Sequence, residues 1–299
     1  MPLKVRVASS PTSWGVSFAS DPLQPPWNRF LDEVARSGYR WIESGGFGYL
    51  PTDPRRLGTQ LVARGLSICG GRVMRNYLFD DEQDSILQEC FQLAELLSAA
   101  GAEAIILIEG LYREKETGRL IDEPELDEAR FKLLVERVVD LARALRSNFP
   151  LKTYFHPHAE THVCTEEHMD RFFELAADPE LGQVLDTGHH AYCGGDPNSY
   201  MARNHARIPY VHLKNIHPEV HARCQAEGTG FLPSVRAGVF CEPEYGPLFD
   251  LRDFRRVLEE VEFDGFAVVE QDLYPVETFA VPEPIATRTR NWLSRNGFG

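Results

Sequence analysis

Long apolar runs and clustered positive charge are both missing from this sequence. No run is long enough to cross a bilayer, and the first segment, MPLKVRVASSPTSWG, lacks the apolar core of a signal peptide, so we expect a cytoplasmic protein. Lys and Arg number 31 against 45 Asp and Glu, which gives a formal net charge of −14. Nucleic acids and anionic membranes are bound by clustered Lys and Arg, so this balance argues against both as partners.

Cysteine pairs, linkers and a dinucleotide fingerprint are missing as well. The six cysteines are scattered without a Cys-x-x-Cys pair, which fits reduced, packed thiols better than a zinc cage or a disulfide framework. No low-complexity linker marks a domain boundary, and no G-x-G-x-x-G follows the first apolar run. We therefore expect one domain over residues 1–299.

Short apolar or β-branched runs alternate with amphipathic helical stretches along the whole chain. Most of these runs lack strict alternation, as expected of parallel strands covered by helices. Repeated strand–helix units imply right-handed crossovers, and eight of them predict a closed (β/α)₈ TIM barrel, an α/β fold, with an open doubly wound sheet as the alternative. The predicted strands are Val5–Ser9, Trp41–Ser44, Leu66–Gly70, Ala104–Glu109, Lys152–His156, Gln183–Asp186, Tyr210–Leu213 and Phe266–Glu270.

One connection, His217–Asp250 between the last two predicted strands, is unusually long. Connections of this length in a compact domain are commonly functional lids. In a barrel this loop lies at the active-site end. We expect a lid over the mouth that is more mobile than the barrel when no ligand is bound.

Ionisable side chains follow four consecutive predicted strands, whose ends meet at one mouth in a barrel. Burying such groups is costly unless they are paired or bound to a metal. His156, Asp186, His212 and Glu270 supply two imidazoles and two carboxylates. This mixed set predicts one divalent metal ion, with Mn²⁺ or Co²⁺ favoured and Mg²⁺, Fe²⁺ or Zn²⁺ as alternatives.

Three further residues are candidates for catalysis. Lys214 lies two residues beyond His212, so strand alternation points both side chains the same way. Near a cation it is suited to acid–base work or to polarising a carbonyl, and a surface salt bridge is the alternative. Glu43 ends the second predicted strand and is a candidate proton shuttle. His158 is a candidate base or a partner that orients a ligand.

The remaining candidates would contact substrate. Glu109 could bind substrate hydroxyls, and Trp14 could stack on a sugar ring, although a packed core tryptophan is the commoner fate. Arg72 and Arg75 are candidates to grip a phosphate or carboxylate, with structural roles as the alternative.

The strand ends resemble the xylose-isomerase-like superfamily of barrels, in which Glu, Asp, His and Glu from strands five to eight hold a metal. Asp186, His212 and Glu270 match the last three positions, whereas His156 replaces the usual Glu. That departure resembles inosose dehydratases, which act on 2-keto-myo-inositol, and the resemblance implies that His189 contacts substrate. The segments similar to that group are Ser10–Gly15, Ile42–Pro51, Leu185–Pro197, Val211–Val220 and Val268–Asp272.

Our leading hypothesis from the sequence is a metal-dependent dehydratase of inositol catabolism. It would act on inosose or a similar neutral, polyhydroxylated ketone by abstracting an α-proton and expelling water, with His158, His189 or Glu43 as base. A sugar or sugar-phosphate isomerase or epimerase shares the first step and is the runner-up. An endonuclease IV-like nuclease and a non-catalytic sugar-binding barrel complete the alternatives, and a homo-oligomer is compatible with the sequence.

Overall fold

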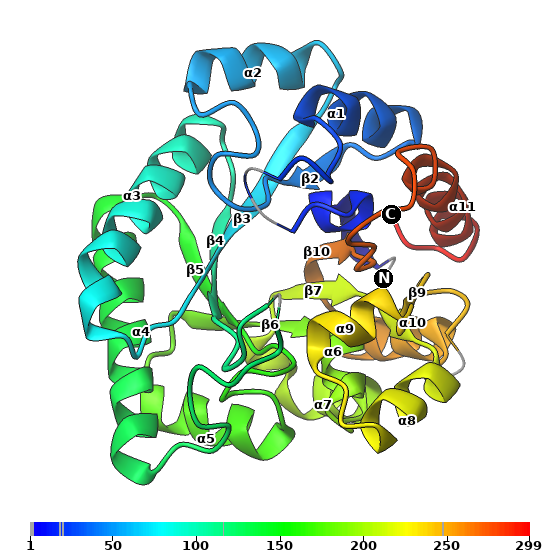
Figure 1. The fold of residues 1–299 in the computed structure, drawn as a ribbon. Helices are drawn as coiled ribbons and strands as arrows, with labels where there is room; N and C mark the ends of the chain where they lie inside the picture. The colour runs from blue at the N-terminus through cyan, green and yellow to red at the C-terminus, as the bar shows by residue number, and fades with distance from the viewer. Residues whose placement is uncertain (1–2, 18, 20, 116, 247) are drawn as a thin grey trace.

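The computed structural model describes residues 3–17, 19, 21–115, 117–246 and 248–299. Eight parallel strands form a closed barrel whose order around the ring follows the chain, which confirms the predicted fold (Figure 1). Each predicted strand overlaps one of the eight. The barrel strands are β1 (Lys4–Ser9), β2 (Trp41–Glu43), β3 (Ser67–Arg75), β4 (Ala104–Glu109), β5 (Lys152–His156), β6 (Leu181–Asp186), β7 (Tyr210–Leu213) and β10 (Asp264–Val269).

Helices surround the barrel, and the last helix packs against the first to close the ring (Figure 1). Several begin at a side chain that accepts a backbone N–H, such as Asp53, Asp127 and Thr165. No helix of the described residues has the length and apolarity that a membrane span requires. The outer helices are α1 (Trp27–Arg36), α2 (Pro54–Val62), α3 (Gln83–Ala99), α4 (Glu128–Asn148), α5 (Glu166–Ala176), α7 (Pro197–Asn204), α10 (Leu251–Glu260) and α11 (Pro282–Arg295), with short 3-10 helices at Pro11–Trp14, Asp80–Glu82 and His205–Arg207.

Each barrel strand is buried on both faces, which explains its continuous apolar sequence. In β4, Ala104, Ile106 and Ile108 belong to the core inside the barrel, whereas Ile105 and Leu107 pack in the layer between strands and helices. The same alternation runs through the other strands. It determines which side chains at the strand ends face the mouth and which face the helices.

The segment His217–Asp250 lies at the mouth and carries regular structure of its own. It contains α8 (Pro218–Ala226), α9 (Phe231–Arg236) and β9 (Phe240–Cys241), which pairs antiparallel with β8 (Asn215–Ile216). These elements and α6 (Thr187–Tyr192) lie together in front of one part of the barrel in Figure 1. The predicted position over the mouth is confirmed, because α9 lines the cavity there. Greater mobility stays a prediction.

Candidate active site

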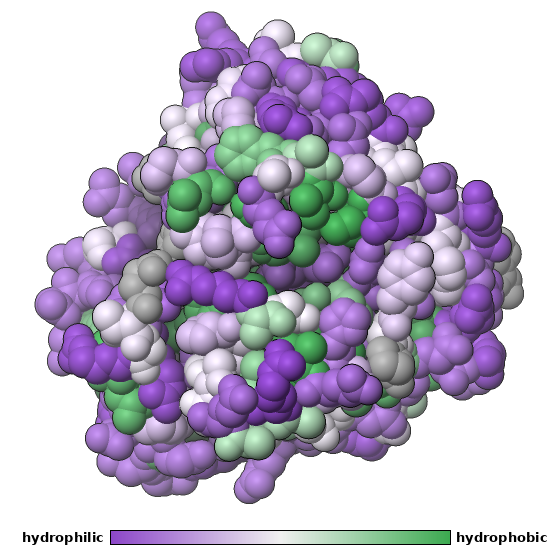
Figure 2. All heavy atoms as spheres, turned by 45° about the vertical axis from the view of Figure 1, so that its right-hand side comes forward, coloured by the Kyte–Doolittle hydropathy of each residue, from purple (hydrophilic) through white to green (hydrophobic). Residues whose placement is uncertain are grey.

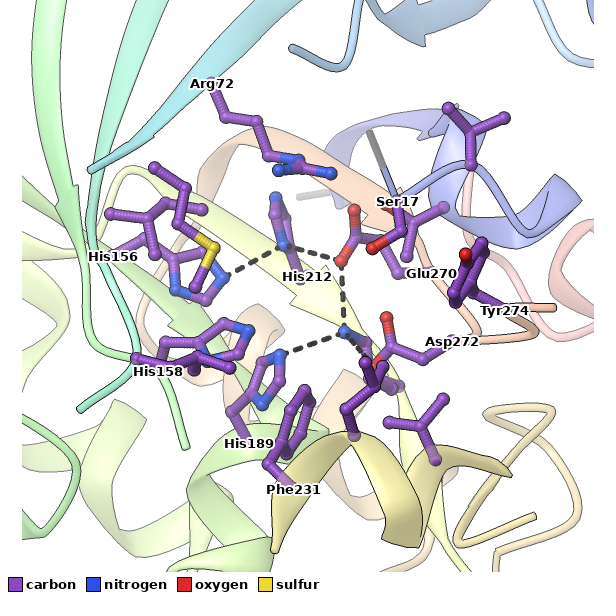
Figure 3. A pocket seen from close by; sticks show the side chains of 18 of the residues that line it. Ser17, Arg72, His156, His158, His189, His212, Phe231, Glu270, Asp272 and Tyr274 are labelled. Atoms are coloured by element: carbon purple, nitrogen blue, oxygen red, sulfur yellow. Dashed lines mark hydrogen bonds and ion pairs between the residues drawn. The ribbon is translucent and has the colours of Figure 1, made fainter. Parts of the chain in front are cut away.

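The four predicted metal ligands converge at the mouth, and Figure 3 shows three of them, His156, His212 and Glu270. His156 Nε2 lies 3.2 Å from His212 Nδ1 and 3.6 Å from Asp186 Oδ2. His212 Nδ1 lies 3.5 Å from Asp186 Oδ2 and 3.3 Å from Glu270 Oε2. All four side chains are buried. Two imidazoles and two carboxylates therefore meet at one point, and they come from β5, β6, β7 and the residue after β10.

The donor set fits a divalent cation. Asp186 Oδ1 accepts the backbone N–H groups of Gly188 and His189, but the buried Oδ2 accepts no hydrogen bond, a costly arrangement without a positive ligand. The Lys214 ammonium is 3.2 Å from Oδ2 but outside hydrogen-bonding geometry. Donor atoms of His156, Asp186 and His212 all lie within 4.8 Å of one another. Glu270 adjoins them through His212.

Lys214 is fully buried beside this cluster. Its Nζ lies 3.1 Å from Glu270 Oε2 and donates to Asp272 Oδ2 at 3.1 Å. Burial alone would lower the pKa of Lys214, but Asp186, Asp272 and Glu270 outweigh it and raise that pKa above its ordinary value. These carboxylates therefore favour the charged ammonium form of Lys214.

His158 and His189 form one wall of the site with their rings in contact, centroids 3.7 Å apart and planes tilted by 38°. His158 Nδ1 lies 2.7 Å from the Ala159 carbonyl oxygen, which assigns the proton to Nδ1 and leaves Nε2 as an acceptor. Burial, and next the neighbouring His156, lower the pKa of His158 well below its ordinary value. His189 Nε2 lies 3.2 Å from Lys214 Nζ and accepts from it. Burial, and next the neighbouring His158 and Lys214, lower the pKa of His189 well below its ordinary value as well.

A cavity that opens to solvent lies over these groups. Figure 2 shows a recess in the middle of one face, with hydrophobic atoms gathered at its edge among hydrophilic ones. Histidines and charged groups lie on the barrel side, and α9 contributes an apolar wall. The lining residues are Thr12, Val16, Ser17, Arg72, Met74, Ile108, Leu111, Lys115, His156, His158, His189, His212, Lys214, Phe231, Leu232, Val235, Glu270, Asp272, Leu273 and Tyr274.

Glu43 lies below the cavity and does not line it. It is fully buried, and its Oε1 accepts hydrogen bonds from Tyr210 Oη at 2.8 Å and from His212 Nε2 at 2.9 Å. Glu43, His212 and Glu270 also form a group whose donor atoms all lie within 4.8 Å of one another, and the role of Glu43 as a proton shuttle stays a prediction. Glu43 holds the His212 ring with Nδ1 toward the cluster, which is the usual arrangement behind a metal-bound histidine.

Three other predicted contacts to substrate do not reach the cavity. Trp14 is fully buried and donates from Nε1 to Glu33 Oε2 at 2.8 Å. Glu109 faces the helices and accepts from His162, with Oε1 2.5 Å from Nδ1. Arg75 pairs beside it with Glu82 and Glu89. These three predictions are corrected: Trp14 is a core residue, and Glu109 and Arg75 stand on the outer face of their strands.

Two parts of the site received no role from the sequence. Asp272 lies two residues beyond Glu270, the same step that relates Lys214 to His212, so strand alternation was an available signal. The apolar wall of Phe231, Leu232 and Val235 had no local signal, because only the tertiary fold places α9 over the mouth.

Known proteins share this fold and nearly the whole length of the chain. An inosose dehydratase of Clostridium botulinum is 26% identical over 294 residues, which is 97% of this chain and 96% of that protein. The structure of a probable 3-DHS dehydratase from Bacillus anthracis superposes with a TM-score of 0.68 at 16% identity, covering 97% of this chain and 99% of the other. The structure of IOLI protein with a bound zinc atom superposes with a TM-score of 0.68 at 14% identity, covering 98% of each chain.

The family assignment rests on a match along most of the sequence. A family model described as xylose isomerase-like TIM barrel matches residues 31–295. The closed barrel and the ligands on its later strands agree with that match. The chain belongs to the xylose isomerase-like TIM barrel family.

Proposed function

We propose that residues 1–299 form one catalytic domain, a metal-dependent hydro-lyase that removes water from a hydroxylated cyclic ketone. The observation that carries this proposal is the buried meeting of His156, Asp186 and His212 beside the Lys214 ammonium. Curated relatives named inosose dehydratase support the reaction type, and make 2-keto-myo-inositol the first substrate to test.

His156, Asp186, His212 and Glu270 would hold the metal ion. Two carboxylates and two neutral imidazoles balance the charge of one divalent cation, and Mn²⁺ or Co²⁺ suits such nitrogen and oxygen donors. When bound, such an ion supplies Lewis-acid polarisation of substrate oxygens. Glu43 contributes indirectly, because its bond to His212 Nε2 fixes the ring with Nδ1 toward the cluster.

His158 is the candidate base. Its Nδ1–H is held by the Ala159 carbonyl, and Nε2 carries the free lone pair of a residue that lines the cavity. It would take the proton from the carbon next to the ketone, and the α-carbanion so formed is an enolate. Contact with the His189 ring restricts the orientation of the His158 ring.

Lys214 is the candidate stabiliser of that enolate. Its ammonium lines the cavity and is held by three carboxylates and by His189. A fixed positive charge in a buried site favours the anionic transition state without reorganising solvent. The His158 Nε2–H formed in the first step would then protonate the departing β-hydroxyl, which leaves as water and completes the dehydration.

Solvent exchange and product analysis test the proposal. Metal-loaded protein in D₂O should exchange the α-hydrogen of 2-keto-myo-inositol and release a dehydrated product, and a chelator should abolish both. An epimerised product of unchanged mass would establish the runner-up, an isomerase or epimerase. If metal-loaded protein neither exchanges the α-hydrogen of any ring ketone tested nor dehydrates it, both the dehydratase and the isomerase or epimerase are refuted.

A further inference from the structure

Arg72 lines the cavity, and no residue in the described part of the chain forms a hydrogen bond or ion pair with its guanidinium. It lies on β3 opposite Ile106 of β4, a residue of the barrel interior, and its side chain points into the cavity near His212 and Glu270 (Figure 3). Carboxylate and carbonyl oxygens of the described residues leave this guanidinium unbonded. Five N–H donors in a planar fork are thus left for a ligand.

Lys214, another cation that lines the cavity, differs from Arg72. Lys214 is surrounded by Asp186, Glu270 and Asp272 at 3.1–3.2 Å, so its charge is already matched. Arg75, three residues after Arg72, is matched by Glu82 and Glu89 on the outer face of β3. Arg72 differs from both, because a half-buried guanidinium faces the cavity with its donors unused.

The apolar wall on the other side of the cavity limits how many hydroxyls the substrate ring can carry. Phe231, Leu232 and Val235 of α9, with Leu111, offer carbon surface to anything bound in the cavity. A ring with a hydroxyl on nearly every carbon would bury some hydroxyls there without partners, which costs affinity. A ring with one edge free of hydroxyls suits this wall better.

We propose that the substrate is a ring ketone that bears a carboxylate, bound by the Arg72 guanidinium, and that it carries fewer hydroxyls than inosose. A planar guanidinium and a planar carboxylate form paired hydrogen bonds, and one monoanion matches one unpaired arginine. This inference rests on the proposed function and names its substrate class. It revises the expectation of a neutral ring that the acidic composition favoured.

Binding of two unreactive alcohols tests the carboxylate site separately from catalysis. Calorimetry on metal-loaded protein would compare shikimate, a carboxylated ring alcohol, with myo-inositol. We expect shikimate to bind at least about tenfold more tightly, on the scale of a charge-assisted hydrogen bond. Arg72→Gln should abolish this preference, Arg72→Lys should keep part of it, and the matched control Arg75→Gln should keep all of it. Equal binding by wild type, or a preference that survives in Arg72→Gln, would overturn the proposal.

Turnover separates this inference from the proposed function. We expect kcat/KM to be higher for 3-dehydroshikimate than for 2-keto-myo-inositol, and Arg72→Gln to lower only the former, by about 10–100-fold. An equal fall on both ketones would assign Arg72 to the shared chemistry and overturn its role in specificity. If shikimate binds through Arg72 while neither ketone is dehydrated or exchanged, the carboxylate site stands and the dehydratase assignment fails.

Discussion

At the scale of single residues, Lys214 has the most direct consequence for turnover. Lys214→Met keeps the aliphatic stem that packs on Gly188 and removes the charge. We expect the metal-loaded variant to lose about 10²–10³-fold in kcat, the usual scale for one electrostatic stabiliser in a buried site. Steady-state kinetics together with α-hydrogen exchange would measure the loss. Normal exchange rates in Lys214→Met would remove the residue from the enolisation step.

Glu43 provides a second residue-scale prediction. Glu43→Gln weakens the hydrogen bond that orients His212, so metal affinity should fall by about 10–100-fold, the range for such partners of metal-bound histidines. Titration calorimetry with Mn²⁺ would measure it. Glu109→Gln is the matched control, because Glu109 is also a buried carboxylate bonded to a histidine but lies outside the cluster. A similar affinity loss in both variants would mean that the effect is general destabilisation.

At the scale of elements, strand alternation separates the residues that reach the site from those that do not. Ile108 and His156 face the interior in register, whereas Arg75 and Glu109 are partners on the outer face. The strand-end position alone predicted Glu109 and Arg75 as site residues. Side chains alternate between the two faces of a strand, and a count from the interior residues places Glu109 and Arg75 on the outer face, away from the site.

The lid helix α9 is tied to the loop after β5. Glu160 Oε1 lies 3.2 Å from Arg113 Nε, and the Glu160 carboxylate also accepts the Phe231 backbone N–H at the start of α9. Glu160→Gln should raise the population of open α9 about fivefold, since such a contact is worth about 1 kcal/mol. Hydrogen exchange of residues 231–237 would report the opening, with KM rising more than kcat falls.

A control variant for this lid lies at the other end of the barrel. Glu103 precedes β4 and pairs with Arg6, so Glu103→Gln removes an ion pair far from the mouth. Exchange in α9 should not respond to it. If Glu160→Gln leaves α9 exchange unchanged as well, the helix is held by its apolar contacts with Tyr192 and Phe240 instead.

At the scale of the whole molecule, the sequence predicted the barrel and the ligand cluster because both follow from periodic signals. Eight apolar runs separated by helical stretches leave few other topologies, and ionisable residues after consecutive parallel strands must meet at one mouth. Periodic signals in the sequence could not predict the roles of Trp14 and α9. A buried indole and an apolar helix over the mouth are decided by contacts between segments distant in sequence, such as Trp14 with Phe30 and Phe231 with His158.

Metal binding should stabilise the whole barrel, because its ligands come from four different strand ends, at β5, β6, β7 and β10. A ligand that binds only the folded state at about 100 times its Kd adds about 2.7 kcal/mol to the free energy of unfolding. For a chain of this size we expect Mn²⁺ to raise Tm by about 4–8 °C over chelator-treated protein, measured by calorimetry. Asp186→Asn should lose most of that increase, since it removes an anionic ligand from the centre of the cluster, whereas Asp178→Asn, a substitution remote from the cluster in the Arg146 ion pair, should retain it. A Tm that is the same with Mn²⁺ and with chelator would contradict metal binding at this mouth, and with it the mechanism proposed for Lys214 and His158.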